Sequence, residues 1–197
     1  LVDTVDMGAL DNLVSGPRAQ DAFLLRLALV PPGCLGVEDE APLTILAQRE
    51  GHAWVVAGER RVRLEPGALC IAKGPEHYLV ADDPGTTVSI IVDPNQQCHA
   101  LDGRSLVDEM LLRARTRGHD REGSAQMLVG TYTRHSEDSR RLQRPRPAQL
   151  ALPADEWDAP LVDLLATDDS SERPGPEVIL DRTLDLLLMT AVRAWLD

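Results

Sequence analysis

The feature that most constrains this chain is a regular series of turn signals between residues 33 and 93. Glycine, proline and aspartate punctuate the sequence there about every 7–10 residues, and short apolar segments lie between them. These segments read LTILAQRE, HAWVVA, RVRLE, ALCIA, YLVAD and TTVSIIV. Short strands at this spacing are typical of an antiparallel sandwich or barrel. We therefore predict a mostly β fold.

Segments outside this region extend the predicted β structure. Three further apolar stretches favour strands: AFLLRLALV at 22–30, QMLVGTYTR at 126–134 and AQLALP at 148–153. Short helices are expected at 5–16, around Leu106–Leu112 and over 136–144.

Side-chain alternation gives the predicted strands two distinct faces. In the segment HAWVVA, Trp54 falls on one face, and Ala53 and Val55 fall on the other. The charged residues of segment 61–65 share a single face, which we expect to lie in water.

The C-terminal residues predict two helices that form a separate unit. The first covers 156–168 and the second covers 177–197, where Glu177 in the first turn favours the helix dipole. The second helix is apolar around most of its circumference and therefore needs cover on more than one side. Either the barrel and the first helix supply that cover, or a partner does. We place a β-barrel domain at 1–153 and a helical unit at 154–197.

The composition excludes several classes of partner. The chain has 32 acidic and 20 basic residues, a net charge of −12, so phosphate backbones and acidic membrane surfaces repel it. Cys34, Cys70 and Cys98 are odd in number and form no CxxC pair, which fits a reducing cytosol better than a disulfide scaffold. No apolar run approaches about 18 residues, so no membrane span is predicted. We expect a cytoplasmic protein.

The order of these segments resembles a known family. From about residue 9 to the end, the chain is similar to cupins, and most closely to the N-terminal sensor domain of AraC-type transcription regulators. The matching stretches, in chain order, are SGPRAQDAFLLRLALVPPG, DEAPLTILAQREGHAWV, RVRLEPGALCIAKGPEHYLVADDP, LVGTYTR, LALPADEWDAPLVDLL and VILDRTLDLLLMTAVRAWL. The resemblance implies a double-stranded β-helix, or jelly-roll barrel, followed by a two-helix unit.

Metal-binding cupins carry the pattern G-x5-H-x-H-x3-4-E-x6-G, followed by G-x5-P-x-G-x2-H. Its imidazoles point into the barrel because strand side chains alternate, and with the carboxylate they hold Fe, Mn or Zn. With its glycines laid on Gly51 and Gly67, the pattern places Thr44 at the Glu and Tyr78 at the third His. Residues 38–40, which are Glu-Asp-Glu, stand at H-x-H.

The imidazole ligands of that pattern are therefore replaced in this chain. His77 lies one residue out of phase with Tyr78, so we expect it to face away from the barrel interior. We predict no metal and no cofactor. A hard cation held by Glu38 and Glu40 stays open as an alternative.

Other arrangements for catalysis are weaker. Cys98 and His99, with Cys34 and His52, form a disfavoured zinc set, because adjacent ligands lack the gap that lets a turn wrap the ion. No serine carries the glycines of a nucleophile elbow. We therefore expect a protein that is not an enzyme.

A barrel without metal ligands can keep its cavity and bind a small molecule. Our candidate lining residues are Glu40, Thr44, Trp54 and Tyr78. The alternative, that these side chains only fill the core, stays open at each position.

The resemblance implies the effector-binding and dimerisation domain of an AraC-type regulator. A ligand in the barrel would change how the helices dock, and DNA would be bound by a separate paired helix-turn-helix domain expected after Asp197. We expect a homodimer, and its candidate contact residues are Leu184, Leu188, Met189, Val192 and Leu196. Two alternatives are a stand-alone cupin enzyme, either an isomerase or a metal-dependent dioxygenase, and a dimerisation module with a filled barrel.

Overall fold

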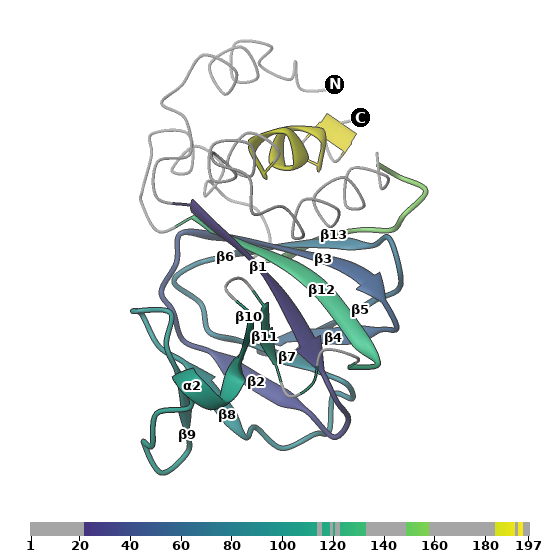
Figure 1. Cartoon of the computed structure of the whole chain (residues 1–197). Coiled ribbons are helices and arrows are strands. Elements are labelled where there is room, and N and C mark those ends of the chain that lie inside the picture. Colours follow the sequence, from purple (N-terminus) through teal and green to yellow (C-terminus); the bar gives the residue numbers. More distant parts are fainter. Residues whose placement is uncertain are drawn as a thin grey trace.

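The computed structural model describes residues 22–113, 116–118, 120, 123–132, 149–157, 184–191 and 193–194. Two β-sheets face each other, and the C-terminal helix lies outside them (Figure 1). The expected helices at 5–16 and 136–144, and that at 156–168 apart from its first two residues, lie outside the described residues.

The larger sheet has seven strands in the order β10-β11-β1-β12-β3-β6-β13. Their bounds are β10 Leu111–Arg113, β11 Thr116–Gly118, β1 Ala22–Leu29, β12 Ala125–Tyr132, β3 Leu43–Glu50, β6 Leu69–Lys73 and β13 Gln149–Leu152. All neighbouring pairs are antiparallel except β1 and β11.

The smaller sheet has six strands in the order β5-β4-β7-β2-β8-β9. Their bounds are β5 Arg60–Leu64, β4 Ala53–Ala57, β7 Tyr78–Ala81, β2 Cys34–Val37, β8 Ile90–Val92 and β9 Cys98–Ala100. A four-residue helix, α2 (Val107–Met110), connects β9 to β10 of the larger sheet.

The mostly β, two-sheet fold predicted from the turn rhythm is confirmed. Every predicted strand is present, although β8 begins four residues later than its segment. The turn before it continues as far as Thr86, whose amide donates to the carbonyl of Asp83 and whose hydroxyl donates to Asp82. The strands β2, β9, β10 and β11 were not predicted.

The central strands of the larger sheet are buried on both faces. In β3, Leu46 packs in the core between the two sheets, whereas Leu43, Ile45 and Ala47 pack in a second core on the outer side. Residues 43–48 are all buried, which is why this segment reads as a nearly continuous apolar run.

The C-terminal helix covers this outer face of the larger sheet. Its residues Leu184, Leu187, Leu188 and Ala191 belong to the second core, together with Trp157. Trp157 also donates a hydrogen bond of 3.0 Å from Nε1 to the carbonyl of Gly67. The barrel thus supplies part of the cover that the apolar helix requires.

Gly130 of β12 sets how closely the helix approaches the sheet. A Cβ atom at this position would lie 2.2 Å from Cδ1 of Leu184, much closer than two carbon atoms can pack. The side chain of Leu184 therefore occupies the space that a larger residue at 130 would need.

We expect Gly130→Ala to lower the free energy of unfolding by about 1–3 kcal/mol, because overpacking pushes the helix away from the sheet. Urea unfolding measures this loss. In combination with Leu184→Ala the added methyl fits, so the double variant should lose less than the sum of the two single variants. Additive losses would contradict this packing.

Candidate ligand cavity

A cavity of about 60 Å³ lies between the two sheets. One water molecule needs about 10–15 Å³ of such space, so the cavity holds roughly four or five water-sized groups. Both sheets and α2 contribute to its wall.

Most of the wall is aliphatic. The larger sheet contributes Leu25, Leu27, Leu46 and Val129, and the smaller sheet contributes Leu35, Val37, Val80 and Val92. Met110 closes the wall from α2 and is 3% exposed. A wall of this kind favours an apolar ligand body.

Tyr78 brings a hydroxyl to this wall from the first position of β7. The side chain is 6% exposed, and its phenol shares a hydrogen bond with Thr44 of the opposite sheet. Burial is the main cause that raises the Tyr78 pKa, and the charge of Asp39 raises it further. Tyr78 is therefore a neutral phenol that ties the two sheets together and can exchange a hydrogen bond with a ligand.

Asp39 and Gln96 form a second polar part of the wall. The Asp39 carboxylate accepts hydrogen bonds from the Ala41 amide at 3.1 Å and from Nε2 of Gln96 at 2.9 Å. Gln96 adopts a left-handed φ of 61° in the turn between β8 and β9.

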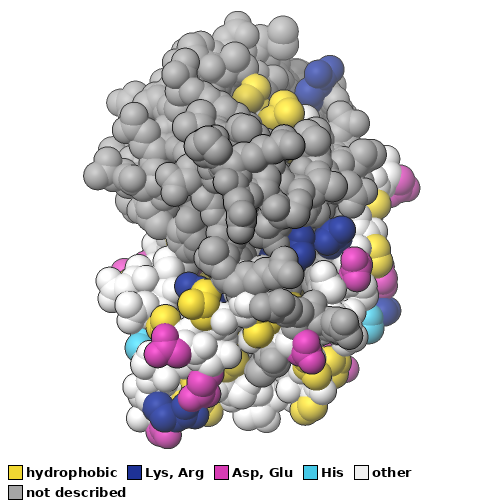
Figure 2. All heavy atoms as spheres, viewed as in Figure 1, with side chains coloured by type: hydrophobic (Ala, Val, Ile, Leu, Met, Phe, Trp, Pro, Cys, Tyr) yellow, Lys and Arg dark blue, Asp and Glu magenta, His cyan; other side chains and the backbone are white. Residues whose placement is uncertain are grey.

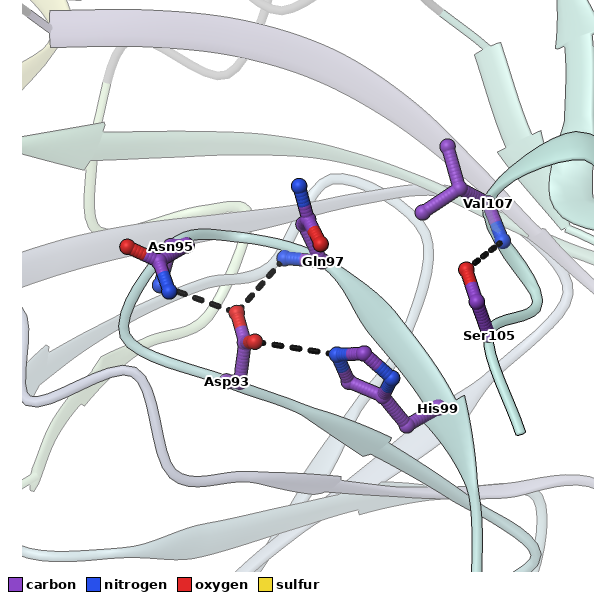
Figure 3. Close-up of polar contacts among 6 residues, drawn as sticks. All are labelled: Asp93, Asn95, Gln97, His99, Ser105 and Val107. Carbon is purple, nitrogen blue, oxygen red and sulfur yellow. Dashed lines mark hydrogen bonds and ion pairs between the residues drawn. The ribbon is translucent and has the colours of Figure 1, made fainter. Parts of the chain in front are cut away.

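Asp93 holds that turn in place (Figure 3). Its carboxylate accepts hydrogen bonds from the amides of Asn95 and Gln97, each at 2.9 Å, and pairs with Nε2 of His99 at 2.9 Å. Burial acts to raise the pKa of Asp93, but the hydrogen bonds from Gln97, His99 and Asn95 together lower it below its ordinary value. The ionised carboxylate thus fixes the turn that presents Gln96 to the cavity.

Arg117 of β11 contributes the one basic side chain among the described residues that line the cavity. It stands in register with Leu27 of β1, so the two side chains share a sheet face. Its Nη1 atom is buried and has no hydrogen-bond partner among the described residues. Burial raises the pKa of the nearby Cys98 thiol, and the charge of Arg117 acts to lower it.

The four predicted lining residues are not all brought together. Tyr78 lines the cavity, and Thr44 shares a hydrogen bond with Tyr78 without lining the cavity itself. Glu40 and Trp54 are not part of the lining. Alternation in β4 turns Ala53 and Val55 toward the core and leaves Trp54 on the other face. Glu40 is exposed in the turn between β2 and β3.

The positions of the histidine and cysteine side chains bear on the predictions about metal ligands. His77 is exposed, as its phase relative to Tyr78 predicts. Within the described ranges, no group of three or more His, Cys, Asp or Glu side chains converges on one point. The three cysteines are buried and free, and burial raises the pKa of Cys70 to about 12.

Parts of the wall that sequence reasoning missed are Asp39, Gln96, Met110 and Arg117. Arg117 comes from a three-residue strand in a polar, poorly periodic stretch, and it reaches the cavity only through the non-local pairing of β11 with β1.

Of the five predicted dimer residues, two are buried, one is half-buried and two lie outside the described residues. Leu184 and Leu188 are buried against the barrel, at 1% and 7% exposure, so they serve the intramolecular core. Met189 is half-buried, and Val192 and Leu196 lie outside the described residues. Leu186, 44% exposed, is an outward-facing apolar residue of the helix, and apolar side chains are visible at the helix position in Figure 2.

The described surface carries charges of both signs. On the face shown in Figure 2, acidic and basic side chains are interspersed over the barrel. None of the described helices is both long enough and apolar enough to cross a bilayer.

A family profile described as cupin matches residues 8–197. No curated protein matches the chain. Two solved structures of ToxT from Vibrio cholerae match the chain at low identity. The apo form of a ToxT variant has 7% identity and a TM-score of 0.47 over 85% of this chain and 54% of that one. Wild-type ToxT with bound unsaturated fatty acid has 8% identity and a TM-score of 0.41, over 88% and 54%. The chain spans about half the length of these proteins.

We expect Asp93→Ala to cost roughly 1–2 kcal/mol of unfolding free energy at pH 7, because three hydrogen bonds to a carboxylate are lost. The pKa of Asp93 is lowered in the folded state, so its contribution is present above the unfolded value of about 3.9 and is lost as pH falls through the folded value. The difference between wild type and variant should therefore shrink below about pH 4.

The measurement is urea unfolding across that pH range. Asp102→Ala is the matched control, because it removes one bond, from the Arg104 amide, in a neighbouring exposed turn. A difference that does not depend on pH would show that the Asp93 charge does not stabilise the turn.

Proposed function

The chain belongs to the cupin family, and from this premise we propose that it is the effector-binding and dimerisation domain of an AraC-type transcription regulator. A small molecule binds between the two sheets and alters transcription through a helix-turn-helix domain elsewhere in the regulator. The protein acts in the cytoplasm, where such regulators meet DNA. The proposal is supported by the sequence stretches that resemble the family's sensor domain and follow one another in the same order along the chain.

The observation that carries the proposal is the position of the cavity relative to the C-terminal helix. In β12, Val129 and Thr131 line the cavity, and Gly130 between them faces Leu184 of the helix. A single layer of backbone therefore separates a bound ligand from the helix. A ligand that fits one helix arrangement better than another shifts the balance between them.

The chemistry of the wall favours recognition over catalysis. Thr44 and Tyr78 stand where the metal-binding cupin pattern has a carboxylate and an imidazole, and burial keeps the Tyr78 phenol protonated. These side chains exchange hydrogen bonds with a ligand but are poor ligands for a divalent metal in their neutral forms.

The first test is elemental analysis of the purified chain together with the coding sequence that follows Asp197. We expect substoichiometric Fe, Mn and Zn, and about a hundred further residues with two helix-turn-helix patterns. One equivalent of any of these metals per chain, removed by Tyr78→Phe but not by His77→Ala, would instead favour a cupin enzyme. His77 is the matched control because it is exposed beside Tyr78.

Dimerisation through the C-terminal helix is part of the proposal, with an interface on the outward face. Leu186 is exposed and Met189 is half-buried, at a spacing that places both on one side of the helix. Leu184 and Leu188 face the barrel and are not available to a partner.

We expect the wild-type chain to be a dimer in light scattering and Leu186→Arg to be a monomer, because a charge in an apolar interface is costly. Leu101→Arg is the control, since Leu101 is 65% exposed on the turn after β9. A Leu186→Arg dimer, or a wild-type chain that is monomeric at every concentration, would refute this interface.

A further inference from the structure

We infer that the effector is a small aliphatic carboxylate, about four to six carbon atoms long, whose anionic head pairs with Arg117 inside the cavity. This inference rests on the proposed function, since it names the class of molecule that the cavity binds.

The guanidinium of Arg117 has a hydrogen-bond donor without a partner in the described structure. Arg117 lines the cavity, and its Nη1 atom is buried with no hydrogen-bond partner among the described residues. A buried cationic donor without a partner is costly, and proteins normally pair it with an acceptor or an anion. A carboxylate accepts two parallel hydrogen bonds from a guanidinium, which matches this donor better than a neutral group does.

The other described polar groups of the cavity do not pair with Arg117. Cys98 is a buried thiol, and burial raises its pKa, so it is neutral and supplies no negative charge. Asp39 lines the same cavity, but its two oxygens accept hydrogen bonds from Ala41 and Gln96, and it forms no ion pair with Arg117. No ion pair of Arg117 is present in the described part of the chain. A direct acceptor for Nη1 is thus left for a ligand to bring.

The aliphatic wall and the size of the cavity suit a short hydrocarbon chain. Leu27, Leu46, Val80 and Val129 form walls that accept methylene groups and offer no hydrogen bonds from their side chains. A volume of about 60 Å³ accommodates about five water-sized groups, which is the size of a short carboxylate chain.

Met110 sets the upper limit on ligand length. It lies in the wall on the four-residue helix α2 and is 3% exposed. Methionine is unbranched and flexible, so removing its side chain enlarges the cavity with little disturbance of the sheets. Met110→Ala should therefore move the preferred chain length upward.

The test is isothermal titration of the 197-residue chain with pentanoate and with its uncharged isostere pentanamide. We expect pentanoate to bind at least tenfold more tightly than pentanamide to wild type. Arg117→Leu should abolish that preference, and it should melt at the same or a higher temperature, because a half-buried guanidinium with an unpaired Nη1 has been replaced by an apolar group. Arg61→Leu, the same change on an exposed position of β5, is the matched control and should behave as wild type.

Arg117→Lys keeps the charge and removes the bidentate geometry, so it should retain a reduced preference for pentanoate even if Arg117→Leu does not fold. A series from propanoate to decanoate should bind best at four to six carbons in wild type and at greater length in Met110→Ala.

Equal binding of pentanoate and pentanamide to wild type, or of pentanoate to wild type and Arg117→Leu, would overturn the role of Arg117. The cavity would then still bind a ligand, and the proposed function would stand. Binding of neither probe would overturn the inference as well. The proposed function would then be judged by the metal content and the downstream sequence. Tightest wild-type binding to decanoate would overturn the length limit.

Discussion

Burial of the larger sheet on both faces is the constraint on which the rest of the structure depends. Side chains on a strand alternate, so Leu46 of β3 faces the cavity and its neighbours Ile45 and Ala47 face the C-terminal helix. A shift of one residue in register would exchange the two sets and expose the apolar wall of the cavity to the helix. The same strands therefore hold the helix in place on one face and shape the ligand site on the other.

The interior of this barrel holds a cavity whose wall combines aliphatic side chains with a few polar groups. Tyr78 and Thr44 share a hydrogen bond between the sheets, and Asp39 is satisfied by Ala41 and Gln96. Arg117 is the exception, because its buried Nη1 has no partner in the described part of the chain. One cationic donor without a described partner, among polar groups that have partners, favours the binding of an anionic molecule.

Local patterns in the sequence predicted most of the fold, and non-local pairing accounts for what they missed. The turn rhythm identified the longer strands, and the phase of Tyr78 against His77 predicted which of the two faces inward. Trp54 shows the limit of reasoning from residue type, because its large ring suits a cavity wall but its strand phase turns it to the other face. Arg117 lies in a short polar segment whose place in the sheet depends on pairing with β1, far away in the sequence.

The central claim is that a ligand between the sheets changes the docking of the helix on their outer side. Amide hydrogen exchange of residues 184–191, with and without saturating pentanoate, tests it most directly. The account predicts that binding changes protection in this helix as well as in β12, which touches both ligand and helix. Protection that changes only in the strands around the cavity, while the helix exchanges at the same rate, would contradict it.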